Sequence, residues 1–465
     1  GRGRGPWGGG ARGGILGSAQ TSTEHPVTTG RPGCALLACL ATASAALAQA
    51  DFRAAFVAND GNLEGSVTSF RVEPDGSLTL IDRVITGARE SLTQDVPGCN
   101  PYAISISPSG RYLLTSHAAG GPDSQIAIIE VAPDGSLSLA TTLDVPSTPL
   151  DCAWISDTLL TATRTSFGAT NEAIVYSFDP QTLALVETDR GLCGAFTSSV
   201  AAHPNGQWIY AGDSTNDLVY AFDVSPAGVV TPIGSASTSP VYALGVRVSP
   251  NGRFLFAAGG ISNGGDKVSA FVINQTTGEL TEVPGSPFLS PGASPARMAI
   301  STDARVLYLG HGTDATCRSF LIDQESGALT STGFSYDIGL QGTLGGLAAL
   351  PGVLLMTDES TAIDGVRGLL SFSQDTSTGA FTPITPAPVS TEGITPESIA
   401  VWAPAPGCSD ADLAAPFGSL DFSDVLAFLA AFGASEPAAD LAEPVGVWDF
   451  SDVVAFLSAF GAGCP

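Results

Sequence analysis

Short alternating runs of hydrophobic and polar residues dominate the chain between residues 54 and 404. Seven of these runs begin and end on an apolar residue, and they lie at residues 67–70, 126–129, 175–178, 219–222, 268–271, 317–320 and 369–372. A period-2 pattern is typical of a β-strand, and the intervening segments lack the 3.6-residue period of a helix. The pattern predicts a protein built from many short strands.

Each run is followed by the same kind of turn, of the form Pro-Asp-Gly or Thr-Gly, and then by another apolar strand. The seven copies of the turn lie at residues 74–78, 133–137, 180–183, 226–229, 277–280, 326–329 and 378–381. A second turn, Ser-Pro-Ser-Gly-Arg at 107–111, recurs at 203–206 and 249–253, with weaker copies at 156–157, 301–305 and 350–352. Four short strands in every repeat of about 50 residues predict a β-propeller.

The two ends of the repeat array indicate how the ring closes. Residues 54–58 match the second strand of a repeat and have no first strand before them, whereas residues 395–402 mirror the first strand at 100–107. We expect the late strand to complete the first blade, because a closed ring leaves no exposed sheet edge. The predicted fold is an all-β, seven-bladed β-propeller over residues 51–404 with a strand-swapped ring closure.

The repeat units also resemble a known family. The patterns V-x-x-F, D-x-x-T/S-G-x-L and S-P-N-G-R-F-L-F are similar to those of the lactonase family, which is typified by 6-phosphogluconolactonase, over about residues 52–404. The resemblance implies the seven-bladed fold, and it implies lactone hydrolysis as the activity to consider.

Polar residues that should meet at one mouth of the channel are the candidates for catalysis. A lactone hydrolase needs a base to activate water and cations to stabilise the oxyanion. His117 or His311 could supply the base, and Arg164 and Arg297 could supply the cations. Polar residues are also expected in any surface loop, which is the competing interpretation. The other polar residues read at this mouth are Asn59, Asp60, Asp213, Asp358 and Glu359.

One departure from the family pattern bears on activity. Many members of the lactonase family carry His-x-His on the first strand of a middle blade, where this chain has Phe196-Thr197-Ser198. The departure favours a binding role over catalysis.

After residue 404 the pattern changes to a duplicated unit, residues 412–429 and 440–457. Each copy is an acidic loop followed by a predicted helix. In the first helix Val425, Phe428, Leu429 and Phe432 follow the i, i+3, i+4, i+7 spacing of a buried face. Residues 405–465 are therefore predicted to form a small α-helical module.

The duplicated unit resembles a dockerin module of the type that ends in Gly-Cys, here Gly463-Cys464. The resemblance implies an EF-hand-like calcium site and a cohesin-like or cell-surface protein partner. The matching ligands are Asp412, Asp421, Asp424, Asp440, Asp449 and Asp452. The competing interpretation is that acids such as Asp421 and Asp424 merely begin a helix, whose dipole favours them. We expect no cofactor in the propeller itself.

The cysteines are interpreted mostly as structural. Cys408 and Cys464 bracket the duplicated unit, and antiparallel packing would bring its ends together, so a disulfide between them is predicted. Cys152 and Cys317 fall at apolar positions of their strands, which predicts buried thiols. The pairing of Cys99 and Cys193 stays open.

Composition and the first fifty residues bear on partners and location. Asp and Glu number 45 against 18 Lys and Arg, and the net charge of −27 argues against nucleic-acid binding. An apolar run at 34–48 after Arg31, closed by Ala48-Gln49-Ala50, matches a secretory signal. We therefore expect residues 1–50 to be an upstream tail and signal, and the protein to be secreted, extracellular, at the cell surface or in the periplasm. No later run of about 20 apolar residues predicts a membrane span.

Three functions remain open from the sequence. The favoured one is an exported propeller that is docked or anchored through its C-terminal module and binds a protein or glycan at the channel mouth. The first alternative is an exported lactonase that acts on a sugar lactone. The second is a structural propeller without a ligand. A small sugar or lactone is the expected ligand of the channel where one binds.

Overall fold

The structure is a computed structural model, and it describes residues 53–61, 64–87, 101–118, 124–145, 147–166, 170–238, 241–259, 266–312, 314–339, 344–360, 366–403, 411, 413, 420, 422–434, 439–442 and 447–462. The predicted signal segment and the predicted disulfide between Cys408 and Cys464 lie outside these residues, as do Asp412 and Asp421.

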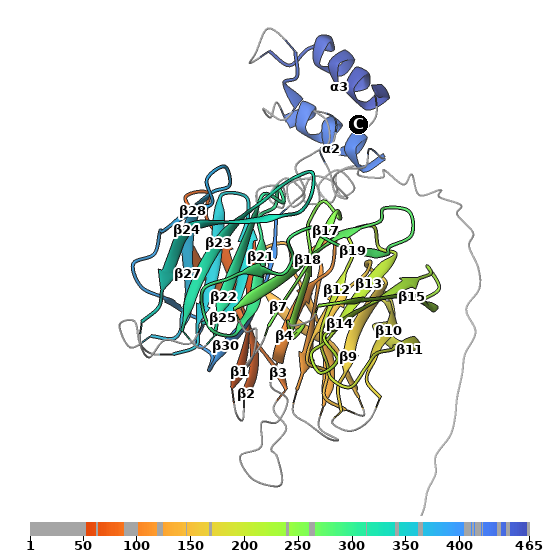
Figure 1. Ribbon diagram of the computed structural model, residues 1–465. Helices are drawn as coiled ribbons and strands as arrows, with labels where there is room; N and C mark the ends of the chain where they lie inside the picture. The colour runs from red at the N-terminus through yellow and green to blue at the C-terminus, as the bar shows by residue number, and fades with distance from the viewer. Residues whose placement is uncertain are drawn as a thin grey trace, which may run out of the picture. The chain divides into compact units, whose positions relative to one another are not determined.

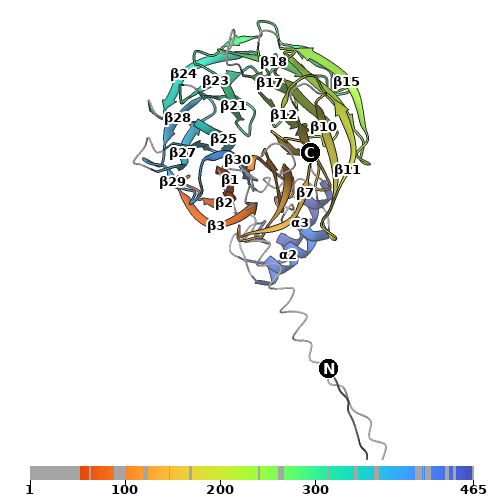
Figure 2. The ribbon, with the colours of Figure 1, turned by 90° about the horizontal axis from the view of Figure 1, so that it is seen from below.

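The strands of the described residues form seven antiparallel sheets arranged in a ring (Figures 1 and 2). The innermost strands of the seven blades, from blade 1 to blade 7, are β30 (Pro396–Trp402), β4 (Pro101–Ile106), β8 (Cys152–Trp154), β12 (Thr197–Ala202), β16 (Gly245–Val248), β21 (Pro295–Ile300) and β25 (Leu344–Leu350). The second strands are β1 (Ala54–Gly61), β5 (Tyr112–His117), β9 (Leu159–Arg164), β13 (Trp208–Asp213), β17 (Phe254–Ala258), β22 (Val306–His311) and β26 (Val353–Asp358). The seven-bladed fold predicted from the repeats is confirmed.

The outer half of each blade consists of a third and a fourth strand. The third strands are β2 (Glu64–Val72), β6 (Gln125–Val131), β10 (Glu172–Asp179), β14 (Leu218–Val224), β18 (Lys267–Ile273), β23 (Thr316–Ile322) and β27 (Gly368–Asp375). The outermost strands are β3 (Leu78–Gly87), β7 (Leu137–Asp144), β11 (Ala184–Leu192), β15 (Val230–Ser237), β19 (Leu280–Glu282) with β20 (Phe288–Leu289), β24 (Leu329–Asp337), and β28 (Ala380–Pro383) with β29 (Val389–Ser390). In blades 5 and 7 the outer edge is thus divided between two short strands.

The ring closes as predicted. Strand β30 pairs antiparallel with β1, with Ala54 opposite Trp402 and Val57 opposite Ile399. The last strand of the propeller therefore supplies the innermost strand of blade 1, and β1 has a partner on both sides.

The core of the propeller lies between neighbouring blades. Among the described residues, seven apolar clusters each join one pair of adjacent blades, and the cluster around Val57 and Leu355 joins blade 7 to blade 1. The second strands lie in the middle of these layers, which is why β5, β13, β22 and β26 are buried along their whole length. The outermost strands such as β7, β11, β15 and β24 carry mainly exposed and half-buried residues because they face solvent.

The recurring turn joins the third and fourth strands of each blade. Its backbone conformation explains why the same residue pattern recurs in the seven repeats. One residue of the turn has a positive φ in each of the seven copies, as at Gly76 with a φ of 82° and at Leu183 with a φ of 57°. Glycine suits that conformation because it has no Cβ. Asp75 completes one such turn by accepting hydrogen bonds from the backbone N and the Oγ of Ser77.

Two helices follow the propeller, α2 (Phe422–Ala434) and α3 (Phe450–Ala462). They pack through stacked rings of Phe428 and Phe456, whose centroids are 4.2 Å apart. Leu429 was expected on the buried face, but it is 57% exposed. The buried residues of α2 are Asp424, Phe428 and Ala431, so the buried face is centred one residue away from the expected one.

Within the described residues, no helix combines the length and the apolar character needed to cross a membrane.

Candidate active site in the channel

One position of the repeat lines the channel in six of the seven blades. It lies five residues before the second turn or its weaker copies in blades 2 to 7, and in blade 1 it is the residue of β30 that matches Tyr102. It is occupied, from blade 1 to blade 7, by Glu397, Tyr102, Asp151, Ser198, Leu244, Ala296 and Gly345. The first six line a cavity of about 540 Å³. The side chains of one strand position thus converge on a single space.

A β-bulge directs several of these side chains. In blade 1 Pro396 pairs with Asn59 and Ser398 with Ala58, so Glu397 is skipped in the register. The same shift skips Tyr102, Ser198 and Ala296 in blades 2, 4 and 6. A bulge re-aims the extra residue, and bulges are frequent next to active sites.

Arg297 of β21 forms an ion pair with Glu397 of β30 across the channel. The Glu397 side chain is 7% exposed and that of Arg297 is 30% exposed. The guanidinium carbon of Arg297 also lies 5.6 Å from the centre of the Tyr102 ring. Together these contacts hold a cation at the wall of the cavity.

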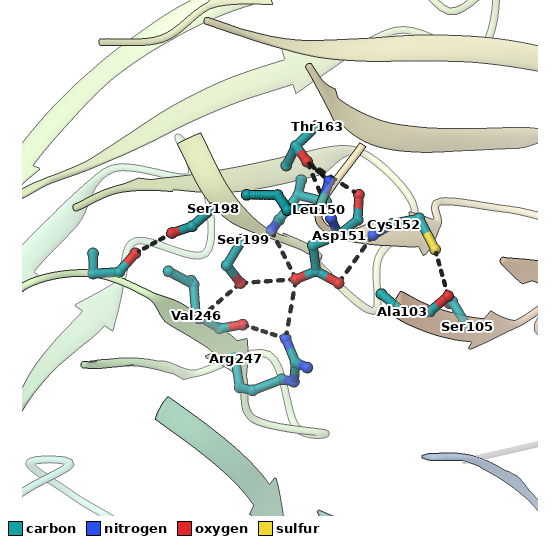
Figure 3. A network of polar contacts seen from close by, with 12 residues as sticks. Ala103, Ser105, Leu150, Asp151, Cys152, Thr163, Ser198, Ser199, Val246 and Arg247 are labelled. Atoms are coloured by element: carbon teal, nitrogen blue, oxygen red, sulfur yellow. Dashed lines mark hydrogen bonds and ion pairs between the residues drawn. The ribbon is translucent and has the colours of Figure 1, made fainter. Parts of the chain in front are cut away.

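A second pair, Arg247 and Asp151, lines the same cavity, and Figure 3 shows its contacts. Nη1 of Arg247 is 3.5 Å from Oδ2 of Asp151 and donates a hydrogen bond of 2.9 Å to the carbonyl of Val246. The same Asp151 oxygen accepts hydrogen bonds from the Ser199 hydroxyl at 2.8 Å and from the Val200 amide at 3.1 Å. The network therefore links blades 3, 4 and 5.

Asp151 and Arg247 also line a second hollow of about 290 Å³ further along the channel, so the pair lies where the two spaces meet. The second hollow is lined largely by apolar residues such as Ile104, Trp154 and Ile399. Among the described residues, the larger cavity is lined by Arg297, Glu359 and Glu397 as well, and the second hollow shares with it only the charged pair Asp151 and Arg247.

Glu359 completes the cavity from the loop after β26. Burial raises its pKa to about 7; the charge of Arg297 acts in the opposite direction, and Asp60 and Asp358 add to the rise. A carboxyl with this pKa is part ionised at neutral pH, which is the condition for a general base or acid.

The space for the Glu359 carboxyl comes from a missing side chain. A Cβ placed on Gly345 would lie 2.7 Å from Oε1 of Glu359, 2.5 Å from Oγ1 of Thr357 and 2.6 Å from the carbonyl of Pro396. Blade 7 thus contributes no side chain at the shared strand position, and Glu359 occupies that place instead.

Of the four residues predicted for catalysis, only Arg297 lines the larger cavity. His117 and His311 end their strands with fully buried side chains. Nε2 of His117 is 2.9 Å from Oγ1 of Thr115, and Nε2 of His311 is 2.7 Å from Oγ of Ser290. Burial also lowers the pKa of His311. The two imidazoles therefore form hydrogen bonds at the ends of their strands and do not line the larger cavity.

Arg164 is also placed elsewhere. Its Nη1 pairs with Glu172 of β10 at 2.7 Å, and Arg190 pairs with the same carboxylate at 3.2 Å. This triad lies within blade 3, where it joins three neighbouring strands. Arg164 is not among the residues that line the cavity.

Sequence reasoning named Arg297 and Glu359 but missed Asp151, Arg247 and Glu397. Asp151 and Glu397 could have been found by aligning the seven repeats on their second turn and reading the residue five positions earlier. Arg247 lies two positions before its turn, where the other blades carry small or apolar residues such as Ser105 and Ala299.

The cysteines of the described propeller behave as buried thiols. Cys152, Cys193 and Cys317 are free and buried. Desolvation raises the pKa of each, that of Cys193 to about 12, so none is a reactive thiolate. The prediction for Cys152 and Cys317 is confirmed.

The predicted calcium ligands are described only in part. Asp424 and Asp452 are fully buried, and their Oδ1 atoms accept hydrogen bonds of 2.8 Å from the amides of Leu413 and Leu441. Asp452 also accepts a hydrogen bond from the amide of Asp449, and these backbone donors lower its pKa. Among the described residues, no group of three or more His, Cys, Asp or Glu side chains is arranged to hold a metal ion.

Comparison with known sequences supports the family resemblance. The model of the family described as "Lactonase, 7-bladed beta-propeller" matches residues 158–259, 190–287 and 242–341. A 6-phosphogluconolactonase of Pectobacterium carotovorum is 22% identical over 265 residues, which are 56% of this chain and 74% of that protein. The 6-phosphogluconolactonase of Yersinia pestis is 23% identical over 196 residues, which are 40% of this chain and 56% of that protein, less than two thirds of its length.

Among solved structures, the periplasmic gluconolactonase of Pseudomonas aeruginosa is similar, with a TM-score of 0.58 and 19% identity. The match covers 76% of this chain and 99% of that one. At this identity the likeness shows a shared fold. The chain is therefore a seven-bladed β-propeller that shares the fold of the lactonase family and matches that family in sequence over residues 158–341.

Proposed function

We propose that this chain is a lactone hydrolase with its active site in the larger channel cavity. The observation that carries the proposal is a half-buried carboxyl, Glu359, whose pKa is about 7 and which shares that cavity with two guanidinium groups. The similarity to proteins named lactonases supports the same reaction class. The assembled cavity favours this hydrolase over the non-catalytic binding module that the sequence favoured.

The reaction uses the groups as follows. Ionised Glu359 takes a proton from water as the water oxygen attacks the lactone carbonyl carbon. The carbonyl electron pair moves onto oxygen, where the charge of Arg297 or Arg247 stabilises the oxyanion. The tetrahedral intermediate then collapses, the bond from the carbonyl carbon to the ring oxygen breaks, and protonated Glu359 returns its proton to that oxygen. The product is an open-chain hydroxy acid.

The ion pairs position the cations for this step. Arg297 is held by Glu397 and by the Tyr102 ring, and Arg247 is held by Asp151 and the Val246 carbonyl. Groups that are fixed before the reaction need little reorganisation as charge develops. The arrangement therefore favours the transition state over the uncharged lactone.

The test is lactone opening by the purified full chain. Hydrolysis of D-glucono-δ-lactone, followed by titrating the acid released, is expected to exceed the spontaneous rate, and the excess should disappear in Glu359→Gln. Glu279→Gln is the matched control, because Glu279 is exposed on the outside of blade 5. Failure to accelerate the opening of any lactone in a panel of δ- and γ-aldonolactones would refute the proposal.

For the C-terminal helices we propose a docking role of the dockerin type. Two observations support it: the duplicated helices α2 and α3 form a core of their own, and Asp424 and Asp452 hold equivalent amides in the two copies. Calcium would be bound with the help of the loop acids. Calorimetric titration of the full chain with calcium should give a saturable signal that Asp424→Ala with Asp452→Ala removes, and a flat titration would rule out the metal.

Export is the remaining part of the proposal. The secretory pattern of residues 31–50 supports it, and one structural neighbour is named as periplasmic. Expression of the chain with its own leader in a Gram-negative host should place the shortened protein, beginning at Asp51, outside the cytoplasm. Recovery of the uncut chain from the cytoplasm alone would contradict this.

A further inference from the structure

We propose that the substrate is an uncharged sugar lactone, and that the channel discriminates against lactones carrying a phosphate or carboxylate. The inference rests on the proposed hydrolase function and deepens it, because it names the substrate class of the same cavity.

The cations of the cavity are already engaged. Among the described residues that line it, the basic side chains are Arg247 and Arg297. Arg247 contacts Asp151 and the Val246 carbonyl, and Arg297 contacts Glu397. Proteins recognise phosphate and carboxylate by pairing them with guanidinium groups, often in a bidentate fork. An anionic substituent would have to displace a carboxylate of the protein to gain such a bidentate contact, whereas a guanidinium with five N–H donors can still give a single hydrogen bond to the oxyanion of the reaction.

The acids of the cavity add to the discrimination. Asp151, Glu397 and Glu359 are three carboxyl groups facing two guanidinium groups in the same space. A phosphate dianion would enter a region whose positive charge is balanced, and it would lie near a carboxylate once Glu359 ionises. Like charges at close range cost affinity, which is a recognised source of specificity.

The rest of the wall suits a neutral polyol. The Tyr102 and Phe196 side chains provide aromatic surface, and Ser198, Ser294 and Ser398 provide hydroxyl groups. Pockets for small ligands commonly combine apolar and aromatic walls with a few polar groups that orient the ligand. A volume of about 540 Å³ is within the range of small-molecule sites and accommodates a monosaccharide lactone.

The experiment compares three lactones on the full chain: D-glucono-δ-lactone, its 6-phosphate, and D-glucaro-1,4-lactone, each corrected for spontaneous opening. We expect kcat/KM for the uncharged lactone to exceed that for each anionic lactone at least tenfold. A preference below tenfold, or a preference for an anionic lactone, would overturn this inference while leaving the hydrolase function intact. Hydrolysis of none of the three would overturn the proposed function itself, and this inference with it.

A variant separates charge from cavity size. Glu397→Gln removes the partner of Arg297, so the preference for the uncharged lactone over the 6-phosphate should shrink at least threefold. Glu392→Gln is the matched control, because Glu392 lies in the segment just before β30 and is exposed, and it should keep the wild-type preference. An unchanged preference in folded Glu397→Gln would overturn the electrostatic basis of the inference. If that variant fails to fold, the wild-type comparison still decides the substrate class.

Discussion

At the scale of single residues, some carboxyl groups of this molecule have pKa values shifted in opposite directions by their environments. Asp75, Asp134 and Asp323 lie in exposed turns, and hydrogen bonds from neighbouring Ser residues lower the pKa of each. Glu359 is half-buried in the channel, and desolvation raises its pKa to about 7. The environment thus makes the turn acids permanently charged anchors and leaves Glu359 able to exchange a proton near neutral pH.

The pH dependence of catalysis should follow from that pKa. Ionised Glu359 is the base, so kcat/KM should rise with pH through about 7 and then level off. Glu359→Gln should lower kcat/KM by about 100-fold or more, as is usual for loss of a general base. The pH–rate profile of initial velocities measures both. A profile flat between pH 5 and 9, or one that is unchanged in the variant, would assign the base to another group.

The ionisation of Glu359 should lower the stability of the fold over the same pH range in which it raises activity. A folded-state pKa raised from 4.5 to about 7 contributes stability that is complete below pH 4.5 and is lost as pH rises through 7. The Tm of Glu359→Gln minus the Tm of wild type should therefore be larger at pH 8 than at pH 4. Asp75→Asn is the contrasting variant: its folded pKa is lowered, so the stability it removes is present above 3.8 and lost as pH falls. Equal Tm differences at both pH values would contradict the assigned shift.

The sequence pointed to only part of this site, for a physical reason. Arg297 and Glu359 were named because their positions in the repeat were expected to lie at the mouth of the channel. Glu397 and Asp151 depend on a strand bulge and a neighbouring blade for their direction, and neither is visible in residue spacing. The imidazoles of His117 and His311 have the right chemistry, but each takes a strand-end position that packing buries completely.

At the scale of elements, the first strand of blade 7 is shaped to admit the Glu359 carboxyl. Gly345→Ala would place a methyl group against Thr357, the Pro396 carbonyl and Glu359. We expect a loss of about 1–3 kcal/mol in the free energy of unfolding, together with a fall in kcat, because overpacking shifts the neighbours. Denaturant unfolding and lactone assays measure the two effects.

The matched control is Gly234→Ala in β15, where an added Cβ has no neighbour within 4 Å. This change should be neutral or stabilise by up to about 1 kcal/mol, because Ala restricts the unfolded chain more than Gly does. A stable and fully active Gly345→Ala protein would contradict the close packing at the Glu359 carboxyl.

The helix pair should depend on one aromatic stack. Phe456 is 1% exposed and stacks on Phe428, so Phe456→Ala should cost about 3–5 kcal/mol and unfold α2 and α3. Leu457→Ala is the control, since Leu457 is 58% exposed and its loss should matter by about 0.5 kcal/mol at most. Hydrogen exchange in residues 422–462 measures both. Protection retained in Phe456→Ala would show that the stack is dispensable.

At the scale of the whole molecule, the closing strand should be required for the propeller. A chain ending before Thr395 lacks β30, which leaves one edge of β1 unpaired and opens the apolar layers on both sides of blade 1. We expect this chain to aggregate or to lose cooperative unfolding. A chain ending after Ala403 keeps β30 and should unfold as cooperatively as the full chain. Calorimetry of the two truncations decides, and a stable ring without β30 would contradict the closure.

The ring was predictable because its evidence is repeated. Seven copies of one turn pattern and one displaced strand were enough to expect seven blades and their closure. The division of the outer edge into β19 with β20, and into β28 with β29, leaves no comparable repeated signal. Leu429 was wrongly expected to be buried. Helical spacing shows which residues share one face of the helix, but it does not show which side of that face the partner helix covers.

The pairing of β1 with β30 has a consequence for how the chain folds during translation. Its two strands lie at opposite ends of the propeller segment, so a ribosome releases the first partner long before it has made the second. Blades 2 to 7 can assemble on one another during that interval, while blade 1 has to wait with β1 incomplete. The nascent chain therefore carries an open strand edge until translation of the propeller is nearly finished, which is the period when a chaperone would protect it.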